Sequence, residues 1–295
     1  MVSFYRRVSG RFAMGSILSR LLAINVALFF VVLLTDVAFT LFNVPHWSIL
    51  PWLQLPSSPA EFVRRPWTIL TYMFTHFDVW HILFNMLLLY LFGRIFIEFF
   101  SARRLGSVYL LGGVAGGLLY MLAYNVIPYF AKDGGALVGA SASVMATVFA
   151  VAIYRRDYEV NLLLIGRVKI IYVALGVLLI DVLGIASSSN VGGHIAHLGG
   201  ASAGALFAVC LRAGMDITLP MSFVLDRLAV VVRGRRRMRV TYVRPTPPPP
   251  GPRPRPYDAS SEIDRILDKL KQSGYSSLSP EEQQKLFDAS KKMNS

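Results

Sequence analysis

The chain has 295 residues, of which 54% are hydrophobic and 16% charged, and its formal net charge is +13 at pH 7. Soluble domains carry about 25% charged residues, so this composition excludes an ordinary soluble domain. The arginines flank apolar blocks or lie in one tail, which argues against nucleic acid as their partner. The single cysteine, Cys210, excludes an intramolecular disulfide and a cysteine-based metal cluster.

Apolar segments of roughly 20 residues recur along the chain, the length needed to cross a bilayer. The first, from about Leu21 to Leu41, is too long for the apolar region of a signal peptide and lacks a clear cleavage site, so it is interpreted as a retained span after a cytoplasmic N-terminal segment, residues 1–20. The pattern predicts an all-α membrane protein with six spans, over 21–42, 80–100, 106–128, 137–154, 168–187 and 194–213.

Basic residues divide unevenly between the two sides of this topology. One side holds the arginines and lysines before span one, between spans two and three, between spans four and five, and after span six. The other side holds Arg64, Arg65 and Lys132. Because cytoplasmic loops are enriched in Lys and Arg, both termini are predicted to be cytoplasmic.

The first outer loop, residues 43–79, is predicted to associate with the membrane, because Trp47, Trp52 and Trp67 lie in it and Trp80 closes it. Spans four and six are rich in glycine, alanine and serine. Small residues four apart let helices approach closely in lipid, so these two spans are predicted to be neighbours.

The C-terminal part contains three predicted segments. Residues 214–243 form a basic juxtamembrane segment with an interfacial helix over 217–232. Residues 244–256, with eight of the sixteen prolines, form a linker. Residues 257–295 form a small cytoplasmic helical hairpin, in which Ser279-Pro280-Glu281-Glu282 has capping-box spacing, and which we expect to recruit a partner.

Polar residues near the outer ends of spans are candidates for chemistry, because polar groups are costly in a membrane. Ser141 and His197 are predicted to lie at similar depths on the neighbouring spans four and six. A serine hydroxyl needs a base to become a nucleophile, and a histidine can supply one. His81 and Asn85 share a helix face and, with the Ser141 amide, could bind an oxyanion.

Other interpretations use the same residues. Ser141 alone could be a helix-packing residue, and His76, His81, His194 and His197 could bind zinc, although the HExxH pattern is absent. His194 lies on the face of His197 and is interpreted as supporting it. Asp36 and Asp181 lie in spans, but the sequence contexts of aspartyl intramembrane proteases are missing. Asp181 lies near the outer end of span five and is therefore assigned a structural hydrogen bond.

Three motifs carry a family resemblance. His76-x4-His81-x3-Asn85, Gly139-Ala140-Ser141-Ala142 and His197-Leu198-Gly199-Gly200, continuing to Gly204, resemble the motifs of rhomboid intramembrane serine proteases. The resemblance covers roughly residues 20–213. It implies a six-helix rhomboid bundle, a Ser141–His197 dyad that requires no aspartate, and an oxyanion hole from His81, Asn85 and the Ser141 amide.

The resemblance also implies cleavage of transmembrane protein substrates near the outer leaflet without a cofactor. Two departures bear on activity: Ala142 replaces a glycine and could crowd the oxyanion site, and Met145 stands where a tyrosine often packs on the histidine. A catalytically inactive protein that binds membrane clients is the alternative. The disulfide-free, lysine-poor loops favour a bacterial cytoplasmic membrane.

Overall fold

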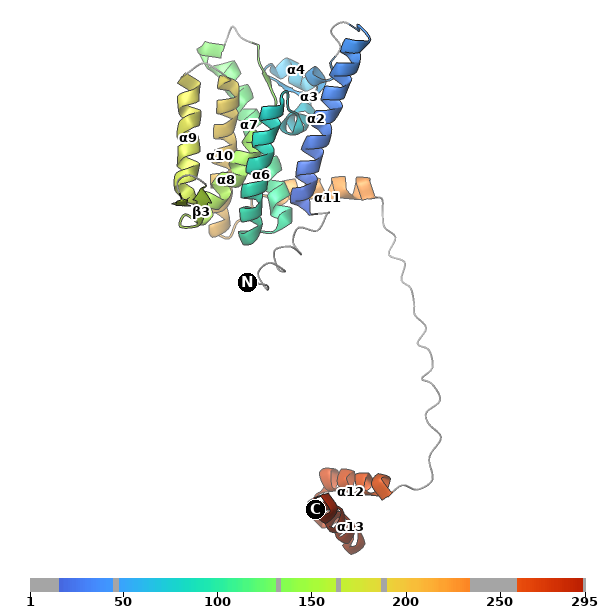
Figure 1. The fold of residues 1–295 in the computed structure, drawn as a ribbon. Helices are drawn as coiled ribbons and strands as arrows, with labels where there is room; N and C mark the ends of the chain where they lie inside the picture. The colour runs from blue at the N-terminus through green and yellow to red at the C-terminus, as the bar shows by residue number, and fades with distance from the viewer. Residues whose placement is uncertain are drawn as a thin grey trace. The chain divides into compact units, whose positions relative to one another are not determined.

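The computed structural model describes residues 16–44, 48–130, 134–162, 166–186, 190–233 and 259–293. Residues 1–15, the loop residues His46 and Trp47, and the proline-rich linker therefore lie outside the described residues. The chain divides between Arg236 and Arg237 into two compact units (Figure 1), each of which is described by itself.

Six apolar helices of the first unit lie over the six predicted segments. Four are long and apolar enough to cross a membrane, whereas α8 and α9, with 14 and 17 residues, are shorter. Much of α8 is enclosed by its neighbours, so most of its surface contacts protein. The helices are α2 (Ile17–Leu41), α6 (Val79–Phe99), α7 (Ala102–Val126), α8 (Ser141–Tyr154), α9 (Ile170–Ala186) and α10 (Val191–Arg212).

The contact between α8 and α10 is the most extensive between two elements of the described residues, which confirms that the fourth and sixth apolar segments are neighbours. Two glycines of α10 permit it. A β-carbon on Gly200 would lie 2.0 Å from the carbonyl oxygen of Ala142, and one on Gly204 would lie 2.1 Å from that of Ala146. The two backbones therefore approach too closely for any side chain at these positions.

Short strands occur where the sequence predicted only helices and loops. β1 (Leu55–Pro56) pairs with β2 (Ala136–Leu137), and β3 (Glu159–Leu162) pairs with β4 (Gly166–Lys169), both antiparallel. The predicted start of the fourth helix at residue 137 was wrong, because residues 136 and 137 form a strand and α8 begins at Ser141. Such short strands carry no periodicity that a sequence reading could detect.

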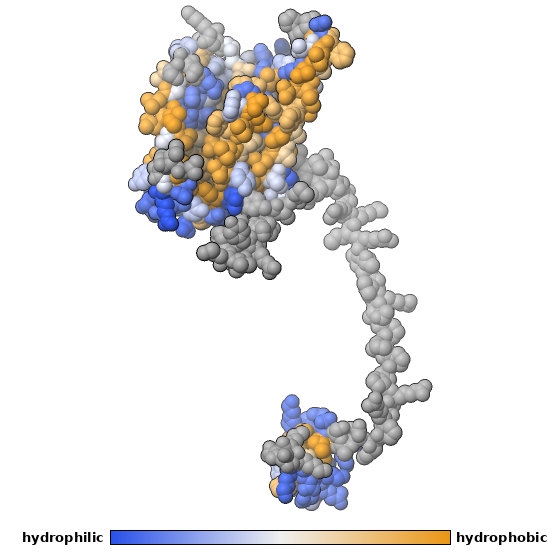
Figure 2. Space-filling model, in the orientation of Figure 1, coloured by the Kyte–Doolittle hydropathy of each residue, from blue (hydrophilic) through white to orange (hydrophobic). Residues whose placement is uncertain are grey.

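The loop before α6 is folded on itself. Its elements are α3 (Leu50–Leu53), α4 (Pro59–Arg64), α5 (Thr68–Thr71) and η2 (Tyr72–Phe74), and η3 (Pro128–Phe130) follows α7. The indole Nε1 of Trp67 donates to the carbonyl of Trp52 at 2.9 Å, and both rings are exposed. Figure 2 shows a broad apolar surface across the helices of this unit, as a membrane protein requires.

The predicted helix after the bundle is α11 (Leu219–Arg233), which packs on α7 across one end of the helices (Figure 1). Polar contacts fix it there. Ser222 Oγ lies 2.8 Å from Ser107 Oγ, Asp226 pairs with Arg103, and Asp216 pairs with Arg104 at 3.0 Å. Segment 214–233 is thus part of the first compact unit, rather than a separate piece.

The second unit is a helical hairpin of α12 (Ala259–Ser273), η4 (Tyr275–Ser277) and α13 (Pro280–Met293). The capping box forms in both directions: Glu282 N–H donates to Ser279 Oγ at 3.3 Å, and Ser279 N–H donates to Glu282 Oε2 at 2.7 Å. Ile266 and Leu278 are buried between the helices. Two helices with a few buried apolar residues make a small core.

Candidate active site

A cavity of about 390 Å³ lies at the end of the bundle where α6, α8 and α10 begin. Four of the residues predicted to act in chemistry line it: Ser141, His197, His81 and Asn85. Trp80, Phe84 and Leu88 of α6 add an apolar wall. Segments far apart in sequence are thus brought to one site, which combines a hydroxyl group, two imidazoles and an amide beside apolar side chains.

The backbone before α8 holds Ser141 at the cavity. Gly139 has φ +122°, a conformation that favours glycine, and its N–H donates to the carbonyl of Tyr72 at 3.0 Å. A β-carbon on Gly139 would lie 2.6 Å from His81 Nε2 and 3.6 Å from Ser141 Oγ. Glycine is therefore required here for both the turn and the close approach of the His81 ring.

Ser141 is the first residue of α8, so its N–H lies at a helix N-terminus. The helical hydrogen bonds begin with Val144 N–H donating to the Ala140 carbonyl at 2.9 Å. The N–H groups of the three preceding residues have no acceptor within the helix, and the helix dipole adds a partial positive charge there. This arrangement favours a negatively charged oxygen beside Ser141.

The first turn of α6 orients two more polar groups. Asp78 caps this helix by accepting from His81 N–H at 2.7 Å. Asn85 donates one amide N–H to the carbonyl of His81 at 2.9 Å, and an amide group carries a second N–H. The His81 ring packs between those of His76 and Phe77, with centroid distances of 5.0 and 4.8 Å.

His76 is fully buried behind the cavity, in the loop before α6. Its Nε2 accepts from the N–H of Ala140 at 3.4 Å, which links this loop to the turn before Ser141. Burial, and secondarily the neighbouring His81, lowers the pKa of His76 from 6.5 to about 3. The imidazole is therefore neutral, as an accepting nitrogen requires.

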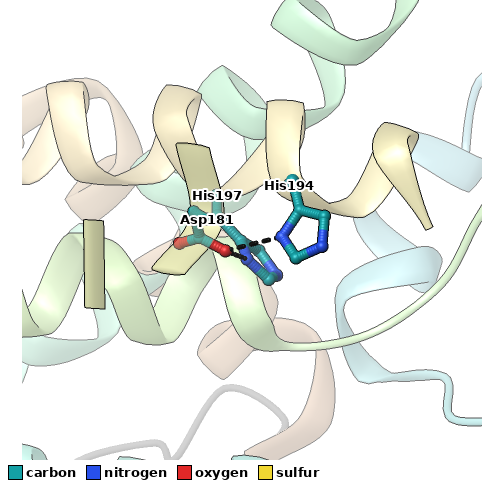
Figure 3. Close-up of side chains that lie close together, drawn as sticks. All are labelled: Asp181, His194 and His197. Carbon is teal, nitrogen blue, oxygen red and sulfur yellow. Dashed lines mark hydrogen bonds and ion pairs between the residues drawn. The ribbon is translucent and has the colours of Figure 1, made fainter. Parts of the chain in front are cut away.

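His197 has a partner that the sequence did not assign to it. Its Nδ1 lies 2.7 Å from Asp181 Oδ1, and His194 Nδ1 lies 2.8 Å from the same oxygen (Figure 3). Asp181 comes from α9 and both histidines come from α10. The sequence signal was a carboxylate inside an apolar segment, which predicted a hydrogen bond, but only the packing of α9 on α10 identifies the acceptor's partners.

The two positions where the chain departs from the motif lie away from the cavity wall. The methyl group of Ala142 faces Gly116 of α7, where an added β-carbon would meet it at 2.6 Å, and Ala142 is buried. Met145 is buried one turn further along α8. Neither residue is among those that line the cavity, and the Ala142 methyl group, which could have crowded the oxyanion site, faces α7.

The structure also bears on the Ser141–His197 hydrogen bond and on the alternative of a four-histidine zinc site. Ser141 and His197 line one cavity, but no hydrogen bond joins their side chains in the described part of the chain. Among the described residues the four histidines do not gather as one group of metal ligands, although His81 and His197 both line the cavity. The group able to hold a metal ion there is Asp181, His194 and His197.

Comparison with known proteins adds two regions of similarity. A family model described as Rhomboid domain matches residues 63–214, and one described as a family of unknown function (DUF6576) matches residues 257–292. The chain is also similar to RHOMBOID-like protein 12, mitochondrial, from Arabidopsis thaliana, with 32% identity over 160 residues. That match covers 50% of this chain and 47% of the relative, so it spans about half of the relative's length.

Proposed function

Because this chain belongs to the rhomboid family, we propose that it is an intramembrane serine endopeptidase, with Ser141 as nucleophile and His197 as general base. The observation that carries the proposal is the shared cavity of Ser141, His197, His81 and Asn85. A structural serine would not need two imidazoles, an amide and a helix N-terminus around it.

The reaction follows from this arrangement. Ser141 Oγ attacks the carbonyl carbon of the scissile peptide bond while His197 Nε2 takes the hydroxyl proton. The N–H of Ser141, the Asn85 amide and His81 stabilise the oxyanion. The intermediate collapses as His197 returns the proton to the leaving amine, which gives an acyl-enzyme. Water, deprotonated by His197, then releases the carboxylate product and restores Ser141.

In the absence of substrate, the missing hydrogen bond between Ser141 and His197 is compatible with this mechanism. Catalytic hydrogen bonds are often long or poorly aligned before substrate binds, and they shorten in the reacting complex. Closure of the distance between Oγ and Nε2 is therefore assigned to the substrate-bound state.

The substrates are proposed to be transmembrane segments of other proteins. A helix has its carbonyl groups engaged in hydrogen bonds, so the segment must unwind locally to expose a scissile bond. Glycine and other weak helix formers near the cleaved bond lower that cost. The apolar wall of Trp80, Phe84 and Leu88 suits the side chains of such a segment.

The topology proposed for the enzyme has six spans, both termini in the cytoplasm and the active site near the outer leaflet. The distribution of basic residues supports it. The bacterial cytoplasmic membrane is the proposed location. The relative is named mitochondrial, which supplies an organellar membrane as the alternative location, and fractionation of the source organism would distinguish the two.

One observation favours a second candidate, an inactive family member that binds membrane clients. The side chains of Ser141 and His197 are not hydrogen-bonded to each other among the described residues, and a base that never reaches the hydroxyl could not activate it. In that case the cavity would hold a client segment without cleaving it. The two candidates differ in whether Ser141 reacts.

Labelling of the detergent-purified protein with a fluorophosphonate serine-hydrolase probe tests the proposal. Wild type should be labelled, and Ser141→Ala and His197→Ala should reduce labelling to background. Ser202→Ala is the matched control, because Ser202 is an exposed serine of α10 outside the cavity, and this variant should label like wild type.

Labelling that survives Ser141→Ala would reject Ser141 as nucleophile. A Ser141→Cys variant tests whether an alkylating probe can reach this position. If it can, and the folded wild-type protein is still not labelled, the client-binding candidate is favoured. Co-purification of a transmembrane client, unchanged between wild type and Ser141→Ala, would then be the second measurement.

A further inference from the structure

We propose that Asp181 is a positioning residue that fixes the tautomer and orientation of His197, so that the Ser141–His197 pair works with a third, supporting side chain. The inference rests on the proposed function. It starts from one geometric fact: a single oxygen, Asp181 Oδ1, lies 2.7 Å from His197 Nδ1 and 2.8 Å from His194 Nδ1 (Figure 3).

The direction of these hydrogen bonds follows from the acceptor. An ionised carboxylate only accepts, so both Nδ1 atoms carry the proton and both imidazoles are Nδ1–H tautomers. The Nε2 atom of His197 then has a free lone pair, and His197 lines the cavity together with Ser141. A base must accept the Ser141 proton at that nitrogen, so the tautomer that Asp181 selects is the competent one.

Burial makes this arrangement depend on all three residues. The side chain of Asp181 is 5% exposed, and its other oxygen, Oδ2, has no hydrogen-bond partner among the described residues. The two imidazoles are therefore the hydrogen-bond donors that compensate for removing this carboxylate from water. The carboxylate in turn stabilises the positive charge that His197 acquires when it takes the serine proton.

His194 is assigned a part in holding the carboxylate. It lies three residues before His197 on α10, so both rings reach α9 from the same helix face. Gly184 gives the His194 ring its space, since a β-carbon there would lie 2.3 Å from His194 Nε2. A second donor to Oδ1 restricts Asp181 to the side-chain position that also reaches His197.

A metal ion is the competing occupant, because these three side chains could offer three ligand atoms. Ligands of a tetrahedral zinc ion, each about 2.0–2.1 Å from the metal, lie roughly 3.3 Å apart. The observed separations of 2.7 and 2.8 Å are shorter and match N–H···O hydrogen bonds with a charged acceptor. The geometry therefore favours protons between these atoms.

The test combines kinetics with a spectroscopic measurement on the full-length protein. Asp181→Leu removes the acceptor and replaces the carboxylate with an apolar side chain. Asp36→Leu in α2 makes the same replacement away from His197 and is the matched control. We expect Asp181→Leu to slow fluorophosphonate labelling by roughly 10- to 100-fold, by analogy with the loss when hydrogen-bond partners of metal-bound histidines are mutated. Asp36→Leu should label at the wild-type rate.

Nitrogen NMR of ¹⁵N-histidine-labelled protein reads the tautomer directly, with the His197 signals assigned from a His197→Gln spectrum. Wild-type His197 should show a protonated Nδ1 and an unprotonated Nε2, and Asp181→Leu should lose this preference. The wild-type spectrum decides the assignment even where Asp181→Leu does not fold.

The outcomes separate this inference from the proposed function. Labelling that requires Ser141 but is unaffected by Asp181→Leu, or an Nε2–H tautomer in wild type, would overturn the positioning role of Asp181 and leave the protease intact. A wild-type protein that is never labelled but shows Nδ1–H at His197, lost in Asp181→Leu, would retain the hydrogen bond and reject the protease. Stoichiometric zinc whose removal abolishes labelling would overturn the positioning role of Asp181 in favour of a metal site.

Discussion

At the scale of single residues, the site depends on groups whose protonation is set by burial. His76 illustrates this, because its Nε2 accepts the N–H of Ala140, directly before the proposed nucleophile. Only the neutral imidazole can accept there. A proton on His76 would break the link between the loop and the start of α8.

This gives a prediction of pH dependence. The pKa of His76 is lowered to about 3 by burial and, secondarily, by His81. The unfolded chain binds a proton near pH 6.5 and the folded protein does not, so stability rises with pH between 3 and 6.5. His76 should thus contribute stability that is fully present above pH 6.5 and lost as the pH falls toward 3, on the order of a few kcal/mol in total.

Thermal unfolding of the purified protein at pH 7.5 and pH 4.5 checks this expectation. His76→Gln keeps an acceptor but cannot titrate, so its stability should fall less over this interval than that of wild type. Other titrating groups are common to both proteins, and the difference isolates His76. Equal losses in the two proteins would contradict the prediction.

At the scale of elements, the fold depends on backbones that lie in contact. Gly200 and Gly204 are four residues apart on α10 and both face carbonyl oxygens of α8. This contact holds the helix of His197 against the helix of Ser141. The strand pair β1–β2 and the turn at Gly139 precede α8, so the position of Ser141 depends on elements that are themselves too short to span a membrane.

Replacing one glycine by alanine in each of two apolar helices separates the effect of a steric clash on stability from the effect of helix propensity. Gly204→Ala places a β-carbon 2.1 Å from a backbone oxygen, which cannot move aside, so we expect a loss of about 1–3 kcal/mol of stability. Gly176→Ala in α9 meets nothing within 4 Å and should be neutral or up to about 1 kcal/mol more stable.

Thermal unfolding in the same detergent measures both variants, and fluorophosphonate labelling provides a functional reading. Gly204→Ala should also label more slowly, because separating α8 from α10 moves His197 away from Ser141. If the two variants were equally stable, the close contact at Gly204 would not limit which side chains the α8–α10 interface accepts.

At the scale of the whole molecule, the chain consists of two compact units joined by a proline-rich segment. Every residue lining the candidate site belongs to the first unit. The second unit has its own small core and its own ion pairs, Lys269–Glu282 and Lys285–Glu262. Its match to a family of unknown function leaves its role in partner binding a prediction.

Deletion of residues 244–295 should therefore leave fluorophosphonate labelling of the first unit unchanged, because no part of the cavity is removed. Labelling rates of the truncated and full-length proteins in the same detergent test this. A truncated protein that folds, by its unfolding temperature, but does not label would show that the hairpin acts on the site.

The sequence by itself determined the membrane class and the approximate positions of the apolar helices, because the length of an apolar segment is a local signal. It also predicted Ser141, His197, His81 and Asn85 as the candidate site, because polar residues within apolar segments are local signals too. It could not determine that α8 begins at Ser141, since two-residue strands have no period. The role of Asp181 was also beyond it. Which side chains an intramembrane carboxylate meets depends on how α9 packs against α10, and that is a property of the tertiary structure.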